Sequence, residues 1–201
     1  TQEGSYEDFD FAKAYFAPLA PVSEVRPSVH LSVDFSGYAG CATLGADRIA
    51  NAVSAAALCP HEALVVIDAG TATTADVGFP PAQEGEKARF LGGVIAPGVG
   101  TMVRALQGGT AQLPEVPLEL PLHAVGQGTT EAIQNGCVRG YRGLLRELLQ
   151  SMEQECGCRL RPVLTGGDAP LLAELMPELG KPEPLLTLRG IALWAKESKK
   201  C

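Results

Sequence analysis

The sequence predicts an α/β protein, and three features support that prediction. An apolar run from Leu64 to Ile67 ends on Asp68 and a glycine turn, a pattern typical of a buried strand with a polar end. Predicted strands and helices follow one another along the chain, including an alanine-rich helix at 44–58. The composition is 46% hydrophobic and 19% charged over 201 residues, which is typical of a globular chain with one large domain or two small ones.

Net charge and cysteine usage argue against several classes of function. The formal net charge is −7 and the basic residues form no block except at 196–200, so nucleic acid is not the expected partner. No apolar run is long enough to span a bilayer and no secretory signal opens the chain, so we expect no membrane partner and a cytoplasmic protein. The six cysteines are expected to be free thiols, and neither they nor the three histidines have metal-site spacing.

Three elements are predicted before the Leu64 strand. Residues 6–16 predict a short helix, and the alternating segment 29–35 predicts a strand. Leu44 to Leu58 predict a helix with Asp47 near its start. Asp47 is either a helix N-cap or a general base, with Arg48 beside it to bind an anionic substrate. Both interpretations stay open on these residues alone.

The stretch from Asp68 to Thr74 combines a carboxylate, a glycine turn and three threonines. Such a hairpin mouth can hold a polyphosphate, with amides and hydroxyls on the phosphate oxygens and the carboxylate on a cation. An ordinary hairpin rich in strand-forming threonine explains the same residues. The segments 75–79 and 88–95 predict two further strands, which complete an antiparallel meander.

A second glycine loop and a proline-rich segment follow the meander. Residues 96–100 lead into a predicted helix at 101–106, either to let a ligand approach the backbone or as a sharp connection. Residues 108–125 carry regularly spaced prolines and predict an extended linker on the surface.

The longest predicted helix runs from 129 to 155, capped by Thr129 or Thr130. Its single apolar face is typical of core packing and, second, of a dimer interface. A strand at 162–165 then meets a Gly-Gly turn and a helix, which is a geometry that accepts nucleotides. A last strand and an apolar helix are predicted within 185–195.

Five stretches together resemble type III pantothenate kinase, in that family's order and with similar spacing. They are Leu44-Gly-Ala-Asp-Arg, Asp68-Ala-Gly-Thr-Ala-Thr-Thr, Leu91-Gly-Gly-Val-Ile-Ala-Pro-Gly, Gly126-Gln-Gly-Thr-Thr-Glu-Ala-Ile-Gln-Asn-Gly and Thr165-Gly-Gly.

The resemblance implies the ribonuclease-H-like, two-domain kinase fold of the actin-like ATPase superfamily, with ATP between the domains. Residues 1–57 would be the remainder of the first domain, and 58–201 the second. The family opens on an Asp-x-Gly-Asn-Thr loop that binds ATP and Mg²⁺, and this sequence contains none. The first domain is therefore expected to lack its leading strands, and the 201-residue chain to bind ATP weakly and turn over poorly.

The activity implied by the resemblance is ATP-dependent phosphorylation of pantothenate to 4'-phosphopantothenate, the first step of coenzyme A biosynthesis. Asp47 would be the general base for in-line phosphoryl transfer. The resemblance assigns pantothenate binding to Tyr38, Gly45, Ala46, Asp47, Arg48 and Thr129, although the proline usual between the tyrosine and the glycine is Cys41 here. ATP binding falls on Gly70, Thr71, Thr165, Gly166 and Gly167.

Cations and a second subunit complete what the resemblance implies. Asp68 would hold a monovalent cation, K⁺ or NH₄⁺, and Mg²⁺ would accompany ATP. Thr129 would reach the pantothenate of a neighbouring subunit in a homodimer. A non-catalytic regulatory or binding protein on the same fold, like the Bvg accessory factors, is the alternative.

Overall fold

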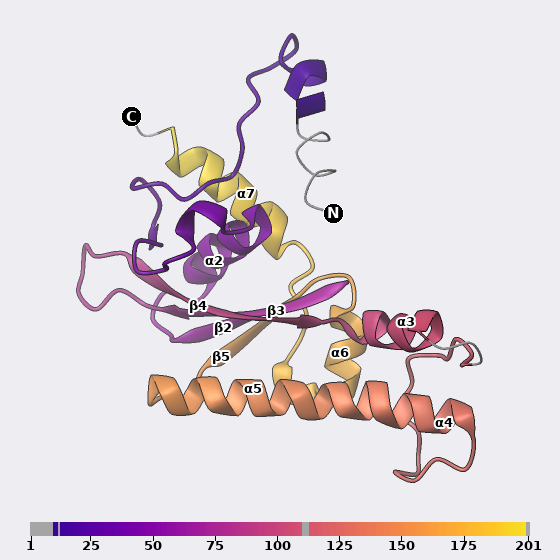
Figure 1. Cartoon of the computed structure of the whole chain (residues 1–201). Coiled ribbons are helices and arrows are strands. Elements are labelled where there is room, and N and C mark those ends of the chain that lie inside the picture. The colour runs from indigo at the N-terminus through magenta and orange to yellow at the C-terminus, as the bar shows by residue number, and fades with distance from the viewer. Residues whose placement is uncertain (1–9, 12, 110–112, 200–201) are drawn as a thin grey trace.

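In the computed structural model, which describes residues 10–11, 13–109 and 113–199, a five-stranded sheet lies between two layers of helices (Figure 1). The strands run in the order β1-β4-β3-β2-β5 across the sheet. Their bounds are β1 Val33–Asp34, β2 Leu64–Ala69, β3 Ala72–Phe79, β4 Ala88–Pro97 and β5 Arg161–Thr165. The helices are α2 Ala46–Leu58, α3 Val99–Gly109, α4 Thr129–Gln134, α5 Gly140–Cys156, α6 Ala169–Leu175 and α7 Leu186–Glu197.

The predicted meander forms the middle of the sheet. β2, β3 and β4 pair antiparallel in sequence, while β1 joins β4 and β5 joins β2 in parallel. In this register Asp68 at the end of β2 lies opposite Thr74 of β3 and Thr165 of β5. The predicted hairpin and the strand at 162–165 are therefore confirmed, and the sheet brings their polar ends to one edge.

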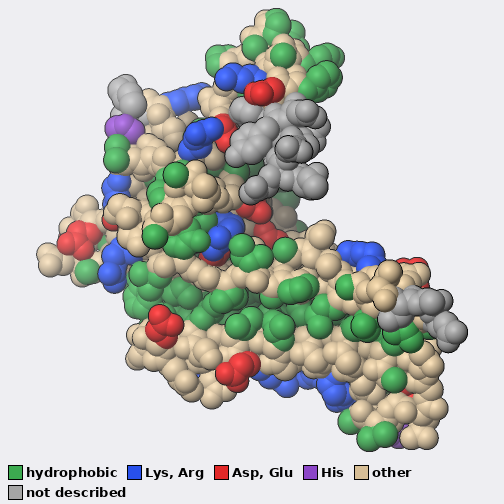
Figure 2. Space-filling model, in the orientation of Figure 1, with side chains coloured by type: hydrophobic (Ala, Val, Ile, Leu, Met, Phe, Trp, Pro, Cys, Tyr) green, Lys and Arg blue, Asp and Glu red, His purple; other side chains and the backbone are tan. Residues whose placement is uncertain are grey.

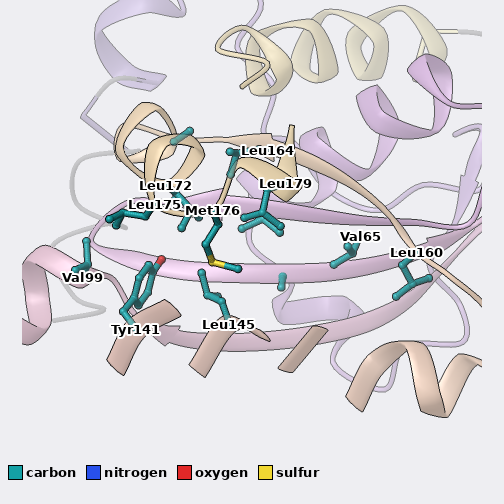
Figure 3. Close-up of a cluster of buried hydrophobic side chains, with 14 of the residues drawn as sticks. Val65, Val99, Tyr141, Leu145, Leu160, Leu164, Leu172, Leu175, Met176 and Leu179 are labelled. Carbon is teal, nitrogen blue, oxygen red and sulfur yellow. The ribbon is translucent and has the colours of Figure 1, made fainter. Parts of the chain in front are cut away.

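The interior strand β2, between β3 and β5, is covered on both faces, which is why its sequence is an unbroken apolar run up to Asp68. Leu64 and Val66 pack with Leu186 on the side of α2 and α7. Val65 and Ile67 join the larger core on the side of α5, where Tyr141 and Leu145 point from the helix toward Met176 (Figure 3). Figure 2 shows hydrophobic side chains as a band along the seam between the sheet and this helix layer.

The long predicted helix is confirmed, with one feature that the sequence did not indicate. A π-helical turn, Asn135–Arg139, joins α4 to α5. The N-cap is Gly128 rather than Thr129 or Thr130, and no side chain caps the helix. The predicted threonine cap is therefore wrong. The helix start is held instead by Glu131, whose Oε2 accepts a hydrogen bond from the backbone N–H of Gln127 at 2.8 Å.

The described part of the proline-rich segment, 113–125, is extended as predicted, but it is not a loose linker. The Gln134 amide donates to the carbonyl of Pro117 at 3.0 Å. Arg139, on the π turn, donates to the carbonyl of Pro121 at 2.9 Å. Val116 is buried in a small cluster under this segment. Side chains from the π-helical region thus fix the segment against the helix.

Two predicted strands are wrong or shortened. Only Val33–Asp34 of the expected strand 29–35 pairs, because the chain makes a turn at residues 28–31 before it and reaches only the first residues of β4. No strand forms within 185–195, where α7 begins at Leu186. A short apolar run does not distinguish strand from helix, and here packing against α2 selects the helix.

The remaining predictions concern the chain ends and the membrane. Residues 6–9 and 12 of the expected helix 6–16 lie outside the described residues, and the described residues 10–11 and 13–16 are helical. Of the helices that the structure describes, none has the length and apolar character needed to cross a bilayer.

Candidate functional site

Asp47 stands at the exposed start of α2. The N-cap residue is Gly45, so the interpretation of Asp47 as the cap is wrong. Asp47 lies in the first turn, after Ala46, and its Oδ1 accepts the backbone N–H of Arg48 at 2.8 Å. A Cβ at Gly45 would lie 2.5 Å from the same oxygen. Any other residue at position 45 would therefore displace the Asp47 carboxylate. A negative side chain is favoured at this positive helix end.

Arg48, the next residue, turns into the protein. Its guanidinium forms a buried ion pair with Asp76 of β3, through Nη2 and through Nε at 2.9 Å. The guanidinium also lies 5.8 Å from the ring centroids of Tyr38 and Phe90. Asp76 raises the pKa of Arg48, while burial raises the pKa of Asp76 against the effect of its partner. The arginine is therefore charged and held in one orientation.

Tyr38 joins Arg48 on the same side of the sheet. Its ring meets Phe90 edge-on at 5.4 Å between centroids. A Cβ at Gly92 would lie 3.1 Å from the Tyr38 ring, so the ring rests closely on the backbone of β4. The structure thus brings together Tyr38, Arg48 and Asp47. Thr129 does not join them within one chain, since α4 lies on the other side of the sheet from α2 (Figure 1).

Asp68 is half-buried at the end of β2, where its Oδ2 accepts a hydrogen bond from the Asn51 amide at 2.8 Å. Gly166 lies against its other oxygen, because a Cβ there would be 2.5 Å from Oδ1. Gly166 also has φ +98°, a conformation that favours glycine. A side chain at 166 would therefore both strain the backbone and press on the carboxylate.

The negative charges of Asp47, Asp68 and Asp76 interact with one another in this region. Burial raises the pKa of Asp68, the hydrogen bond from Asn51 lowers it, and the negative charge of Asp47 raises it again. Asp47 and Asp68 both raise the pKa of Asp76 in the same way. The three acids therefore interact electrostatically, and Arg48 forms an ion pair with one of them, Asp76.

The two glycine loops predicted near a phosphate pack on each other. The Thr71 carbonyl accepts the Gly98 N–H at 3.0 Å and the Thr101 hydroxyl at 2.7 Å. A Cβ at Gly98 would overlap the carbonyl of Gly70. The close approach that Gly98 permits is thus to the neighbouring turn of the same chain. It holds the hairpin at Gly70 and Thr71 rigid, while the Thr71 side chain is exposed.

The turn after β5 lies beside the same edge. The buried Thr165 donates its hydroxyl to the Glu183 carbonyl at 2.9 Å, so this side chain stabilises the fold. Gly167 is exposed, and the next residue, Asp168, donates its N–H to the carbonyl of Ala69 at 2.9 Å. The glycine backbone of this turn, rather than the threonine hydroxyl, faces outward next to Asp68.

Comparison with known proteins identifies the family. The family model described as type III pantothenate kinase matches residues 4–151. This chain belongs to the type III pantothenate kinase family. A type III pantothenate kinase of Akkermansia muciniphila is 43% identical over 152 residues, covering 76% of this chain and 60% of the relative. One from Dehalococcoides mccartyi is 37% identical over 183 residues, covering 90% of this chain and 66% of the relative.

The chain therefore spans less than two thirds of the length of these type III pantothenate kinases. Among solved structures, a Campylobacter jejuni protein named as a conserved Baf family transcriptional activator aligns over 89% of this chain and 71% of its own, with TM-score 0.55 and 24% identity. That likeness concerns the fold alone. The predicted family and α/β ribonuclease-H-like fold are confirmed, and the domain boundary after residue 57 stays a prediction.

The acidic groups are the part of this family member that could hold a cation. Among the residues that the structure describes, no three His, Cys, Asp or Glu side chains group into a metal centre. Asp68 and Asp47 fit a different arrangement, because Mg²⁺ with a phosphate ligand needs only one or two protein carboxylates and completes its shell with water. The surplus of negative charge around Arg48 also favours a cation here.

The sequence motifs missed two buried partners in this site, Asp76 and Asn51. Each is a polar residue between two apolar neighbours in its element, and each is only 2–4% exposed. That contrast is the signal that could have found them, since a buried charge or amide requires a partner. Asn51 also follows Asp47 by four residues, which places both on one face of α2.

Proposed function

We propose that this chain carries catalytic residues for ATP-dependent phosphorylation of pantothenate to 4'-phosphopantothenate, the first step of coenzyme A biosynthesis. One observation supports this most: α2 holds an exposed acid and an anchored arginine at its start, and its next turn contacts the Asp68 carboxylate. A base, a group for an anionic substrate and a cation ligand are thereby fixed to one rigid helix.

Asp47 is the proposed general base. It takes the proton of the pantothenate hydroxyl as that oxygen forms a bond to the γ-phosphorus of ATP, and the bond from this phosphorus to ADP breaks. Its exposure and its position at a helix start suit this task.

Pantothenate would bind beside Asp47, against Tyr38 and Arg48, with Gly45 and Ala46 of the helix start beneath it. Arg48 uses Nε and Nη2 on Asp76 and also interacts with Tyr38, and its remaining N–H groups would face the carboxylate of pantothenate. Asp76 thus fixes the orientation of the Arg48 guanidinium and balances its positive charge. Because residue 45 is glycine, no side chain of this residue lies between the Arg48 guanidinium and Asp47.

ATP would lie along the glycine edge of the sheet. Gly70 and Thr71 offer backbone and hydroxyl groups to the phosphates, and Gly166 and Gly167 offer an open backbone on the adenosine side. Thr165 would act by fixing that turn, because its hydroxyl is bonded within the fold.

Two cations would support the transfer. Asp68 is the proposed ligand of a monovalent cation, K⁺ or NH₄⁺, and Mg²⁺ would be bound by the ATP phosphates near Asp68 and Asp47. When bound, these ions neutralise phosphate charge during transfer. The acidic surroundings of Asp68 support this assignment.

A homodimer through the long helix is also proposed, with Thr129 reaching the pantothenate of the neighbouring subunit. The outward face of this helix carries three exposed glycines, Gly136, Gly140 and Gly143. Each costs an isolated helix about 0.5–1 kcal/mol relative to alanine. Close approach of a second helix would offset that cost.

Gly140→Leu should therefore weaken the dimer. The protomer tolerates the change, since a Cβ at this position meets nothing closer than 4.0 Å. We expect at least a tenfold rise in the dimer dissociation constant, measured by light scattering over a dilution series. Gly108→Leu, at an equally open helix position in α3, is the control and should leave the constant unchanged. An unchanged dimer in Gly140→Leu would exclude this face.

The activity is tested by mass spectrometry. The full chain is incubated in buffer with ATP, Mg²⁺, pantothenate and K⁺, and with K⁺ replaced by tetramethylammonium in the control. Phosphopantothenate that forms only with K⁺ supports the proposed kinase activity. A folded chain that binds pantothenate but forms no product would point instead to a binding protein on the same fold.

A further inference from the structure

The side chain of Asn51 connects three elements of the site. It lies on α2, is 2% exposed, and forms two side-chain hydrogen bonds. Its Nδ2 donates to Oδ2 of Asp68 on β2 at 2.8 Å, and its Oδ1 accepts from the hydroxyl of Thr187 on α7 at 2.8 Å. A continuous chain of hydrogen bonds thus runs from α7 through α2 to the end of β2.

The two neighbours fix the orientation of the Asn51 amide. An ionised carboxylate only accepts hydrogen bonds, so the amide must turn its NH₂ group toward Asp68. Its oxygen then faces Thr187, whose hydroxyl can donate. The Thr187 hydroxyl therefore stabilises the amide orientation in which Asn51 donates to Asp68.

The approach of α7 to α2 brings Thr187 within reach. Gly190 lies one turn after Thr187, and a Cβ there would overlap the carbonyl of Ala50 on α2. The two helix backbones therefore touch next to Asn51. Because both helices are in direct contact, the position of the Thr187 hydroxyl is set by rigid elements and not by a loop.

The second oxygen of Asp68 is left for another partner. Gly166 lies against Oδ1 without a side chain, while Oδ2 is occupied by Asn51. Asn51 also follows Asp47 by one helical turn, so the same helix carries the proposed base and the anchor of the cation carboxylate. Fixing Asp68 to α2 sets the separation of the two acids.

We infer that Asn51 is a positioning residue for Asp68, oriented by Thr187, and that this hydrogen-bond chain presents the carboxylate to the bound cation. The inference rests on the proposed function for the role of Asp68. It assigns to α7 a part in cation binding, although α7 carries none of the site residues that the motifs predicted.

Thr187→Val is the variant that tests the chain, because it removes the hydroxyl with little change of shape. We expect the K⁺ concentration for half-maximal activation to rise at least fivefold, with a smaller change in KM for pantothenate. Asn51→Ala should raise this K⁺ concentration further. Thr187→Ser, which keeps the hydroxyl, should have a half-maximal K⁺ concentration within twofold of the wild type. Trp194→Phe, on the same helix, is the control. It removes a hydrogen bond to the Arg26 carbonyl and should leave the half-maximal K⁺ concentration unchanged.

A second readout does not depend on catalysis. K⁺ should raise the melting temperature of the wild-type chain over tetramethylammonium at equal ionic strength, and Thr187→Val should lose most of that rise. If both Thr187→Val and Asn51→Ala keep the wild-type K⁺ response in activity and in melting, the inference is overturned while the proposed function stands. If the wild type forms no product but melting responds to K⁺ as expected in all variants, the proposed function fails and the positioning role stands.

Discussion

Asp47→Asn will lower kcat for phosphopantothenate formation by about 10²–10⁴-fold, the usual contribution of a general base. Asparagine has nearly the same shape and can still accept the backbone N–H of Arg48, so the helix start should remain intact. The amide cannot take a proton from the substrate hydroxyl. Mass-spectrometric rates at saturating ATP, pantothenate and K⁺ measure the loss.

The same experiment separates catalysis from helix stabilisation. An acid in the first turn contributes about 0.3–1 kcal/mol to stability through the helix dipole, and that loss alone would not change kcat. Glu131→Gln is the matched control, since Glu131 is the first-turn acid of α4. Both variants should unfold within about 1 kcal/mol of the wild type. A kcat for Asp47→Asn within a few-fold of the wild type would remove Asp47 from the role of base.

Local patterns were sufficient to predict the middle of the sheet. The apolar run of β2, the glycine turn after it and the two strand segments that follow are all short-range features. Each of these features depends on residues that are close together in the sequence. The predicted and observed bounds of the strands therefore differ by only a few residues. The polar residues at the strand ends were predicted for the same reason.

The wrong secondary-structure predictions concern segments whose structure depends on contacts with residues distant in the sequence. The segment at 185–195 is mostly apolar, and it forms a helix that packs closely on α2, about 140 residues earlier in the chain, where Gly190 meets Ala50. The expected strand at 29–35 shortens to two residues because the chain turns at 28–31 and pairs only with the first two residues of β4. The π turn at 135–139 likewise goes with contacts to the distant segment 113–125.

The candidate site likewise contains residues that the sequence predicts and residues whose roles depend on the folded structure. Asp47 and Asp68 could be chosen from the sequence because each stands beside a glycine at the end of an element. Asp76 and Asn51 lie in the middle of β3 and α2, and their roles depend on partners in other elements. The sequence alone suggests that Arg48 is open to substrate, whereas two of its three guanidinium nitrogens bond to Asp76. Only the packed structure distinguishes an anchored guanidinium from a free one.

Asp76→Ala should destabilise the chain by about 3–5 kcal/mol, because it leaves the Arg48 guanidinium buried without a carboxylate. The side chains of this pair are 9% and 5% exposed, so water cannot replace the lost partner. Urea unfolding followed by circular dichroism measures the change. Activity at a temperature where the variant is folded should fall as well, since Arg48 loses the group that aims it.

Two further variants show whether burial causes this loss. Glu178→Ala breaks the exposed pair with Arg146 and should cost at most about 1 kcal/mol, because water solvates the remaining charge. The double variant Arg48→Met with Asp76→Leu removes both buried charges and should recover most of the stability lost in Asp76→Ala. If the double variant is as unstable as Asp76→Ala, packing at this position rather than the uncompensated charge would be the cause. If it recovers stability but forms no product, the buried pair is retained for the site and not for the fold.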